Sequence, residues 1–68
     1  MKSYYVQFIS TKERESEIYQ ECKVSSSYKQ LVKDTLEQAE FLRTNVFEVD
    51  TVKIFSYIDG KILETFNL

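Results

Sequence analysis

The side chains in this chain that most readily do chemistry are one thiol and eleven carboxylates, because the 68 residues include one cysteine and no histidine. Nucleophilic catalysis needs a base beside the nucleophile and a group that orients the base. Cys22 has no histidine to activate it, and the alternation of its neighbours groups it with Ile18 and Val24. We therefore expect Cys22 to be a small buried hydrophobic residue that faces the core.

The carboxylates show no arrangement that is typical of acid–base catalysis. Glu13, Glu15 and Glu17 alternate in a polar stretch, and no acidic residue stands in the apolar surroundings that would shift its pKa. The single glycine, Gly60, follows Asp59 and is explained by a turn, not by a phosphate or calcium loop. The sequence therefore predicts a protein that is not an enzyme and that has no catalytic residue, metal ion or cofactor.

Length and composition favour one small folded domain over residues 1–68. The chain is 43% hydrophobic, which is enough for a core, and its net charge is −2. Nine basic residues against eleven acidic ones are too balanced to predict a nucleic-acid-binding field. The sequence shows no apolar run of membrane-spanning length, no signal-peptide core and a free thiol, so we expect a cytoplasmic protein without membrane contact.

Four strands are predicted, at Ser3–Ser10, Glu17–Ser25, Thr51–Ile58 and Lys61–Leu68. The first is rich in strand-forming residues, the second alternates more plainly, and the last two flank a hairpin signal. The polar stretch between the first two strands is typical of a solvated turn. Asp59-Gly60 between the last two is a strong hairpin signal.

Between the second and third strands, apolar residues fall on one helical stripe. Ser27 and Gln30 are spaced as a capping box, and Asn45 suits a left-handed helix end. The helix should run from about Ser27 to about Thr44. The result is a single two-layer α+β domain of β-β-α-β-β order, with one helix on one face of a four-stranded sheet.

This order resembles that of the β-grasp fold. The resemblance implies a mixed sheet in which the first and fourth strands pair in parallel at the centre, with the second and third strands at the edges. It covers most of the chain, but it is one of layout and carries no function.

A single helix covers one face of such a sheet, so a second set of side chains must face away from it. We assign to the helix face Val6, Phe8, Ile18, Val24, Val52, Ile54 and Leu63. We assign to the open face Tyr5, Tyr19, Phe55 and Tyr57, with Ile9 and Ile62 as further candidates. The register of the last hairpin decides between Ile62 and Leu63, because a bulge at Gly60 would exchange their faces.

Aromatic side chains on an open sheet face are typical of protein interfaces. The predicted partner-binding residues are Tyr5, Tyr19, Phe55, Tyr57 and Phe41. Phe41 falls on the helix side opposite the core stripe, and it is either an exposed anchor or a contact that closes the helix end. A small acidic domain of this kind suits a stoichiometric inhibitor or adaptor of the type that phages and mobile elements encode, with a protein as its partner.

Three alternatives remain open. The tyrosines of a two-layer domain can simply stand in water with their hydroxyl groups solvated. The same face can stack single-stranded nucleic acid, with Lys23 and Lys53 as the nearest cations, although nucleic acid is the less favoured partner. It can also form a homodimer that supports a marginal core.

Overall fold

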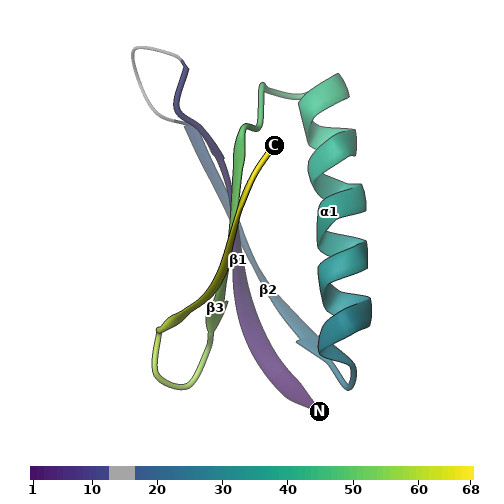
Figure 1. Ribbon diagram of the computed structural model, residues 1–68, viewed down its shortest axis with the longest axis vertical. Helices are drawn as coiled ribbons and strands as arrows, with labels where there is room; N and C mark the ends of the chain where they lie inside the picture. The colour runs from purple at the N-terminus through teal and green to yellow at the C-terminus, as the bar shows by residue number, and fades with distance from the viewer. Residues whose placement is uncertain (13–16) are drawn as a thin grey trace.

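The computed structural model describes residues 1–12 and 17–68, and these form one open four-stranded sheet with a helix on one face (Figure 1). The elements follow in the order β1 (Lys2–Ser10), β2 (Glu17–Ser25), α1 (Tyr28–Asn45), β3 (Thr51–Ser56) and β4 (Ile62–Asn67). The predicted α+β class and β-β-α-β-β order are confirmed. The predicted polar turn between β1 and β2, with Glu13 and Glu15, lies largely outside the described residues.

The strand order differs from that of the β-grasp fold. The sheet order is β2-β1-β3-β4, and each neighbouring pair is antiparallel. The expected mixed sheet with a parallel β1–β4 centre is therefore wrong, and β2 and β4 form the edges. The reason lies in burial: β3 places Val52 and Ile54, both without exposed surface, beneath the helix. On the same face β4 has Glu64 and Phe66, and a strand with a carboxylate suits an edge.

The helix begins at the predicted cap. The Gln30 amide donates to the Ser27 hydroxyl at 3.3 Å, as an N-cap requires. The second bond of the capping box, from the Gln30 side chain back to the cap, does not form, because the Gln30 side chain donates to Asp34 instead. The predicted left-handed end at Asn45 is wrong, since glycine alone has a positive φ among the described residues, and Val46 closes the helix by donating its amide to the Leu42 carbonyl.

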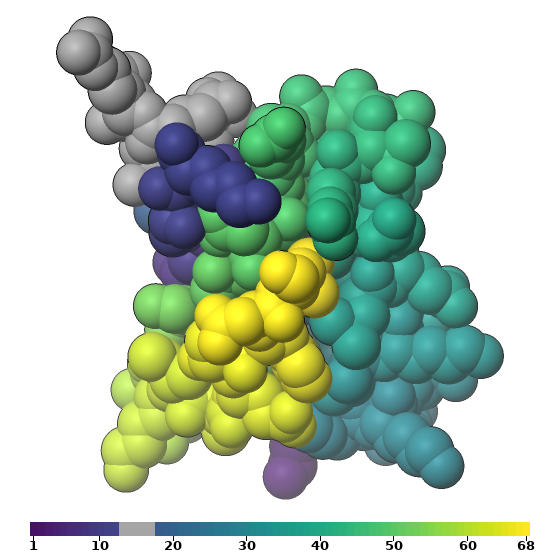
Figure 2. Space-filling model, turned by 45° about the horizontal axis from the view of Figure 1, so that its top comes forward, coloured from purple at the N-terminus to yellow at the C-terminus, as the bar shows by residue number. Residues whose placement is uncertain are grey.

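The core lies between α1 and the two central strands. It consists of Tyr4, Val6, Phe8, Leu31, Ala39, Leu42, Val49, Val52 and Ile54. Figure 2 shows the end of β4 beside the helix, where Phe66 packs against this core. The face is therefore dry under α1 and becomes partly exposed toward both sheet edges.

Asp50 joins three parts of the chain at the start of β3. Its carboxylate accepts hydrogen bonds from the Thr11 amide at 2.9 Å and from the Thr11 hydroxyl at 2.8 Å. Its carbonyl accepts the Leu68 amide, and its amide donates to the Ile9 carbonyl. The bond from the Thr11 amide is the main cause of the lowered pKa of Asp50.

The last hairpin fixes the face of two apolar residues. Its turn is longer than the two residues expected, because the Ser56 amide donates to the Lys61 carbonyl, and Gly60 has a φ of 69°. A bulge follows, with Phe55 opposite Ile62 and Ile54 opposite Glu64. The bulge comes after Ile62 and not at Gly60, so Ile62 lies on the open face and Leu63 is the extra residue on the helix side.

One buried hydroxyl leads to a first stability prediction. Thr35 is fully buried on α1, and its Oγ1 has no hydrogen-bond partner among the described residues. Thr35→Val keeps the side-chain shape and removes this unpaired group. We expect the free energy of unfolding to rise by about 1 kcal/mol, measured by urea denaturation.

The control for this prediction is Thr44→Val on the same helix. Thr44 is exposed, and its hydroxyl donates to the Glu40 carbonyl, so the change should stay within about 0.5 kcal/mol. A Thr35→Val variant that is less stable than the wild type would contradict the assignment.

Candidate interaction surface

The strand register defines the face of the sheet that has no helix on it. Residues that pair across antiparallel strands share a face, and Tyr5 pairs with Cys22 on one side and with Phe55 on the other. Phe55 pairs in turn with Ile62. We call this surface the open face, and its strand residues are Ser3, Tyr5, Gln7, Ile9, Ile18, Gln20, Cys22, Val24, Thr51, Lys53, Phe55, Ile62, Thr65 and Asn67.

Tyr5 and Tyr57 form the centre of an aromatic cluster on the open face. Their rings stack with centroids 5.5 Å apart and an interplanar angle of 14°. Tyr57 is 53% exposed and Ile62 is 54% exposed. A shallow hollow of about 170 Å³ lies beside them, lined by Tyr5, Gln7, Gln20, Phe55 and Gly60. The structure therefore places three of the predicted binding residues together.

The orientation of β2 is the reverse of the one expected. Tyr19 pairs with Phe8 on the helix side, and the two rings lie 6.0 Å apart. Ile18, Cys22 and Val24 consequently lie on the open face and are exposed. The assignments of Tyr19 to the open face, of Ile18 and Val24 to the helix face, and of Cys22 to the core are therefore wrong.

The apolar core beneath α1 is made with the central strands β1 and β3, and β2 contributes no residue to it. At β2, Gln38 meets charged side chains instead of apolar ones: it accepts from Lys23 at 2.6 Å and donates to Glu21 at 3.0 Å. Lys23 also lies 3.5 Å from Glu21. Burial raises the pKa of Glu21, but bonds from Gln38 and Tyr19, together with Lys23, bring it below its ordinary value.

The described strand positions of the open face have almost no charge. Lys53 is the single basic residue among its strand positions, and none of these positions is acidic. Lys23, expected as a second cation there, lies on the helix side. A side-chain hydrogen bond with Cys22 is the main cause of the raised pKa of Tyr5, which agrees with their pairing on this face.

Ile9 and Phe41 do not join the aromatic cluster. Ile9 shares the open-face register but is buried at the end of β1. Phe41 is 62% exposed on α1, on the layer opposite the open face. The five predicted binding residues thus occupy three separate surfaces.

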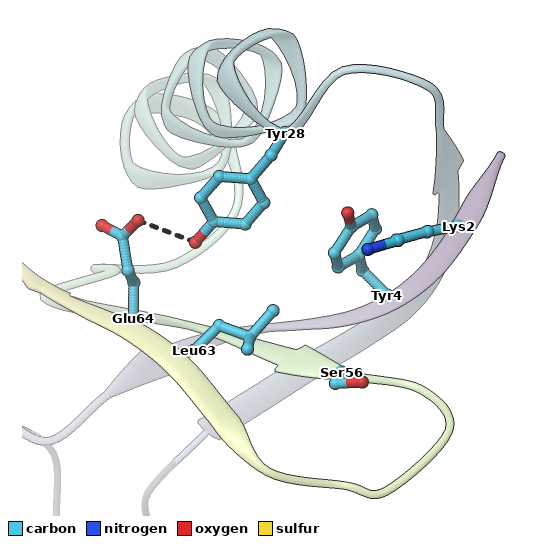
Figure 3. A pocket seen from close by; sticks show the side chains of 6 residues that line it. All are labelled: Lys2, Tyr4, Tyr28, Ser56, Leu63 and Glu64. Atoms are coloured by element: carbon cyan, nitrogen blue, oxygen red, sulfur yellow. Dashed lines mark hydrogen bonds between the residues drawn. The ribbon is translucent and has the colours of Figure 1, made fainter.

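Sequence reasoning missed a second hollow, of about 450 Å³, between the start of α1 and β4 (Figure 3). Tyr28 donates its hydroxyl to Glu64 at 2.7 Å, and its ring lies 5.8 Å from that of Tyr4. Lys2, Ser56 and Leu63 complete the lining. No local motif signals this arrangement, because it joins residues that are 36 positions apart.

The Tyr28–Glu64 contact predicts a loss of stability at high pH. Burial, together with Glu64, raises the pKa of Tyr28 to about 12 from its ordinary 10.0. Between these pH values the folded chain keeps the Tyr28 proton, whereas the unfolded chain releases it. The contribution of Tyr28 to the free energy of unfolding is therefore full below about pH 10 and is lost toward about pH 12. Urea denaturation across this range should show the loss.

The Tyr28→Phe variant isolates this contribution. It lacks the titrating hydroxyl, so its free energy of unfolding should fall less steeply over the same pH range than that of the wild type. Equal slopes for the two proteins would contradict the prediction.

Among the described residues, no group of three or more His, Cys, Asp or Glu side chains is placed to hold a metal ion. No helix in the described ranges has the length and apolarity needed to cross a bilayer. Comparisons with protein-family models, curated proteins and solved structures give no match.

Proposed function

We propose that the protein is a non-enzymatic binding module that attaches to a partner protein through its open face. In this account it works by stoichiometric occupation, as an inhibitor or adaptor of the type that phages and mobile elements encode. Tyr5, Phe55, Tyr57 and Ile62 provide the contact area, and the absence of histidine in the sequence agrees with a role without catalysis.

The observation that carries the proposal is the exposed aromatic stack of Tyr5 and Tyr57 beside Phe55. Tyrosine and phenylalanine are enriched at interface centres, where charged residues are depleted. This face combines both properties, since Lys53 is its single charged strand residue. The lack of further cations among the described strand positions of this face supports a protein partner over single-stranded nucleic acid, which needs basic groups along its backbone.

Capture from a nuclease-treated host lysate tests this proposal. The wild-type domain and a helix-surface control, Lys33→Ala, should retain the same protein in a one-to-one ratio, and Tyr57→Ala should not. Retention should persist at raised salt, because an apolar contact depends little on ionic strength. Capture that depends on intact nucleic acid, or that is equal for all three baits, would contradict the proposal.

A further inference from the structure

The outer edge of β2 is long and regular, and no other described strand pairs with it. It has nine residues, and its pairing with β1 runs without interruption from Ser25 to Glu17. The opposite edge, β4, has six residues and is interrupted by the bulge at Leu63. Bulges and short strands protect a sheet edge from pairing, and β2 has neither protection.

The direction of the backbone groups in β2 follows from two hydrogen bonds in β1. The carbonyls of Ser3 and Ile9 accept amides from the β3 side. Alternate residues of a strand point to opposite sides, so the even-numbered residues of β1 are hydrogen-bonded to β2. Their partners in β2 are Tyr19, Glu21 and Lys23. The outward N–H and C=O groups of β2 therefore belong to Gln20, Cys22 and Val24.

The side chains of this edge are complementary to themselves. If a second copy pairs antiparallel about a two-fold axis at Cys22, Glu21 of each copy stands opposite Lys23 of the other. The outward backbone groups of Gln20, Cys22 and Val24 then meet in register. An axis at Glu21 or at Lys23 would place like charges opposite each other, which is destabilising. The charges thus favour the register centred on Cys22.

We propose that the protein forms a symmetric homodimer through β2, in which two sheets join into one of eight strands. Glu21 and Lys23 are partly exposed, at 29% and 20%, so both can reach across the two-fold axis. The open faces of both copies then become continuous, and each keeps its Tyr5–Tyr57 stack free. The dimer is thus compatible with the proposed partner binding and does not depend on it.

A charge exchange tests this dimer by sedimentation equilibrium of the reduced protein at up to about 1 mM. Glu21→Lys and Lys23→Glu should each raise the dissociation constant by about tenfold or more, because each change occurs twice in the dimer. The double exchange E21K/K23E should restore it to within about twofold. Lys33→Glu, with the same charge change as Lys23→Glu but on an exposed helix position, should leave it unchanged.

A backbone variant provides a second test of the dimer if a charge variant unfolds. The Gln20 amide points away from β1, so Gln20→Pro removes no bond of the β1–β2 ladder and blocks the edge. This variant should keep the thermal transition of the wild type and remain monomeric. A wild type that stays monomeric at about 1 mM, or a double exchange as monomeric as the single changes, would overturn the proposal.

Cys22 gives an independent test of the register. Directly opposed residues of a hydrogen-bonded pair have Cα atoms about 5.5 Å apart, within the range of a disulfide. Diamide, which takes two electrons and two protons from two thiols, should therefore link the copies through Cys22. Glu21→Lys should slow this linkage and the double exchange should restore its rate. A rate that the charge changes leave unaltered would overturn the register.

Discussion

Phe8→Ala is expected to lower the free energy of unfolding by about 3–5 kcal/mol. Phe8 has no exposed surface and lies on central strand β1, between Tyr19 of β2 and Val52 of β3. A core of this size usually supplies only about 3–5 kcal/mol in total, so the substitution should leave little or no folded protein. Urea denaturation followed by far-ultraviolet circular dichroism measures the effect.

Tyr57→Ala is the matched control on the other face. Its ring is half exposed and stacks on Tyr5, so the loss should be about 1 kcal/mol or less. If Phe8→Ala were as stable as Tyr57→Ala, the assignment of the dry and open faces would be wrong.

Tyr57→Ala is also expected to weaken partner binding by about 2 kcal/mol or more, which is roughly 30-fold in the dissociation constant. Large effects come from aromatic residues at the centre of an interface, and Tyr57 stacks on Tyr5 beside Phe55 and the hollow. Phe55→Ala should have an effect of the same direction. Titration calorimetry with the purified captured partner measures both affinities.

Phe41→Ala tests whether the other exposed aromatic residue, on the helix, also contributes to partner binding. Phe41 lies on the helix layer, and its removal should leave the affinity unchanged. If Phe41→Ala weakened binding and Tyr57→Ala did not, the interface would lie on α1, contrary to our proposal.

Local patterns were sufficient to predict the four strands, the helix and its first cap. Ser27 with Gln30 marks the start of α1, and Asp59-Gly60 marks the last hairpin. These signals depend on neighbours in the chain, so they are readable without knowledge of the packing. The open-face positions of Tyr5 and Phe55 were predicted from the alternation of their strands, and the pairing of these two residues confirms them.

The orientation of β2 required information that its own alternation does not contain. The apolar set with Ile18 and Val24 gives the better hydrophobic pattern, and it is the set that faces away from the helix. Pairing with β1 and the contact of Gln38 with Glu21 and Lys23 outweigh that pattern. At an edge strand, partly buried polar side chains lower the stability of the fold only slightly when they are hydrogen-bonded.

The strand order also depends on competition between distant segments. Both strands of the last hairpin have the composition to lie beside β1. The fully buried pair of Val52 and Ile54 places β3 there, whereas Glu64 in β4 is satisfied by Tyr28 at the edge. Glu64 is the residue in the sequence that favours an edge position for β4.

Site-specific photo-crosslinking tests the central claim most directly. A photoreactive phenylalanine analogue would replace Tyr57 on the open face in one protein and Phe41 on α1 in another, and both would be irradiated in host lysate. Our account predicts that position 57 forms a covalent adduct with one distinct protein and that position 41 does not. An adduct with that protein from position 41 alone, or adducts with nucleic acid only, would contradict the claim that the open face binds a protein.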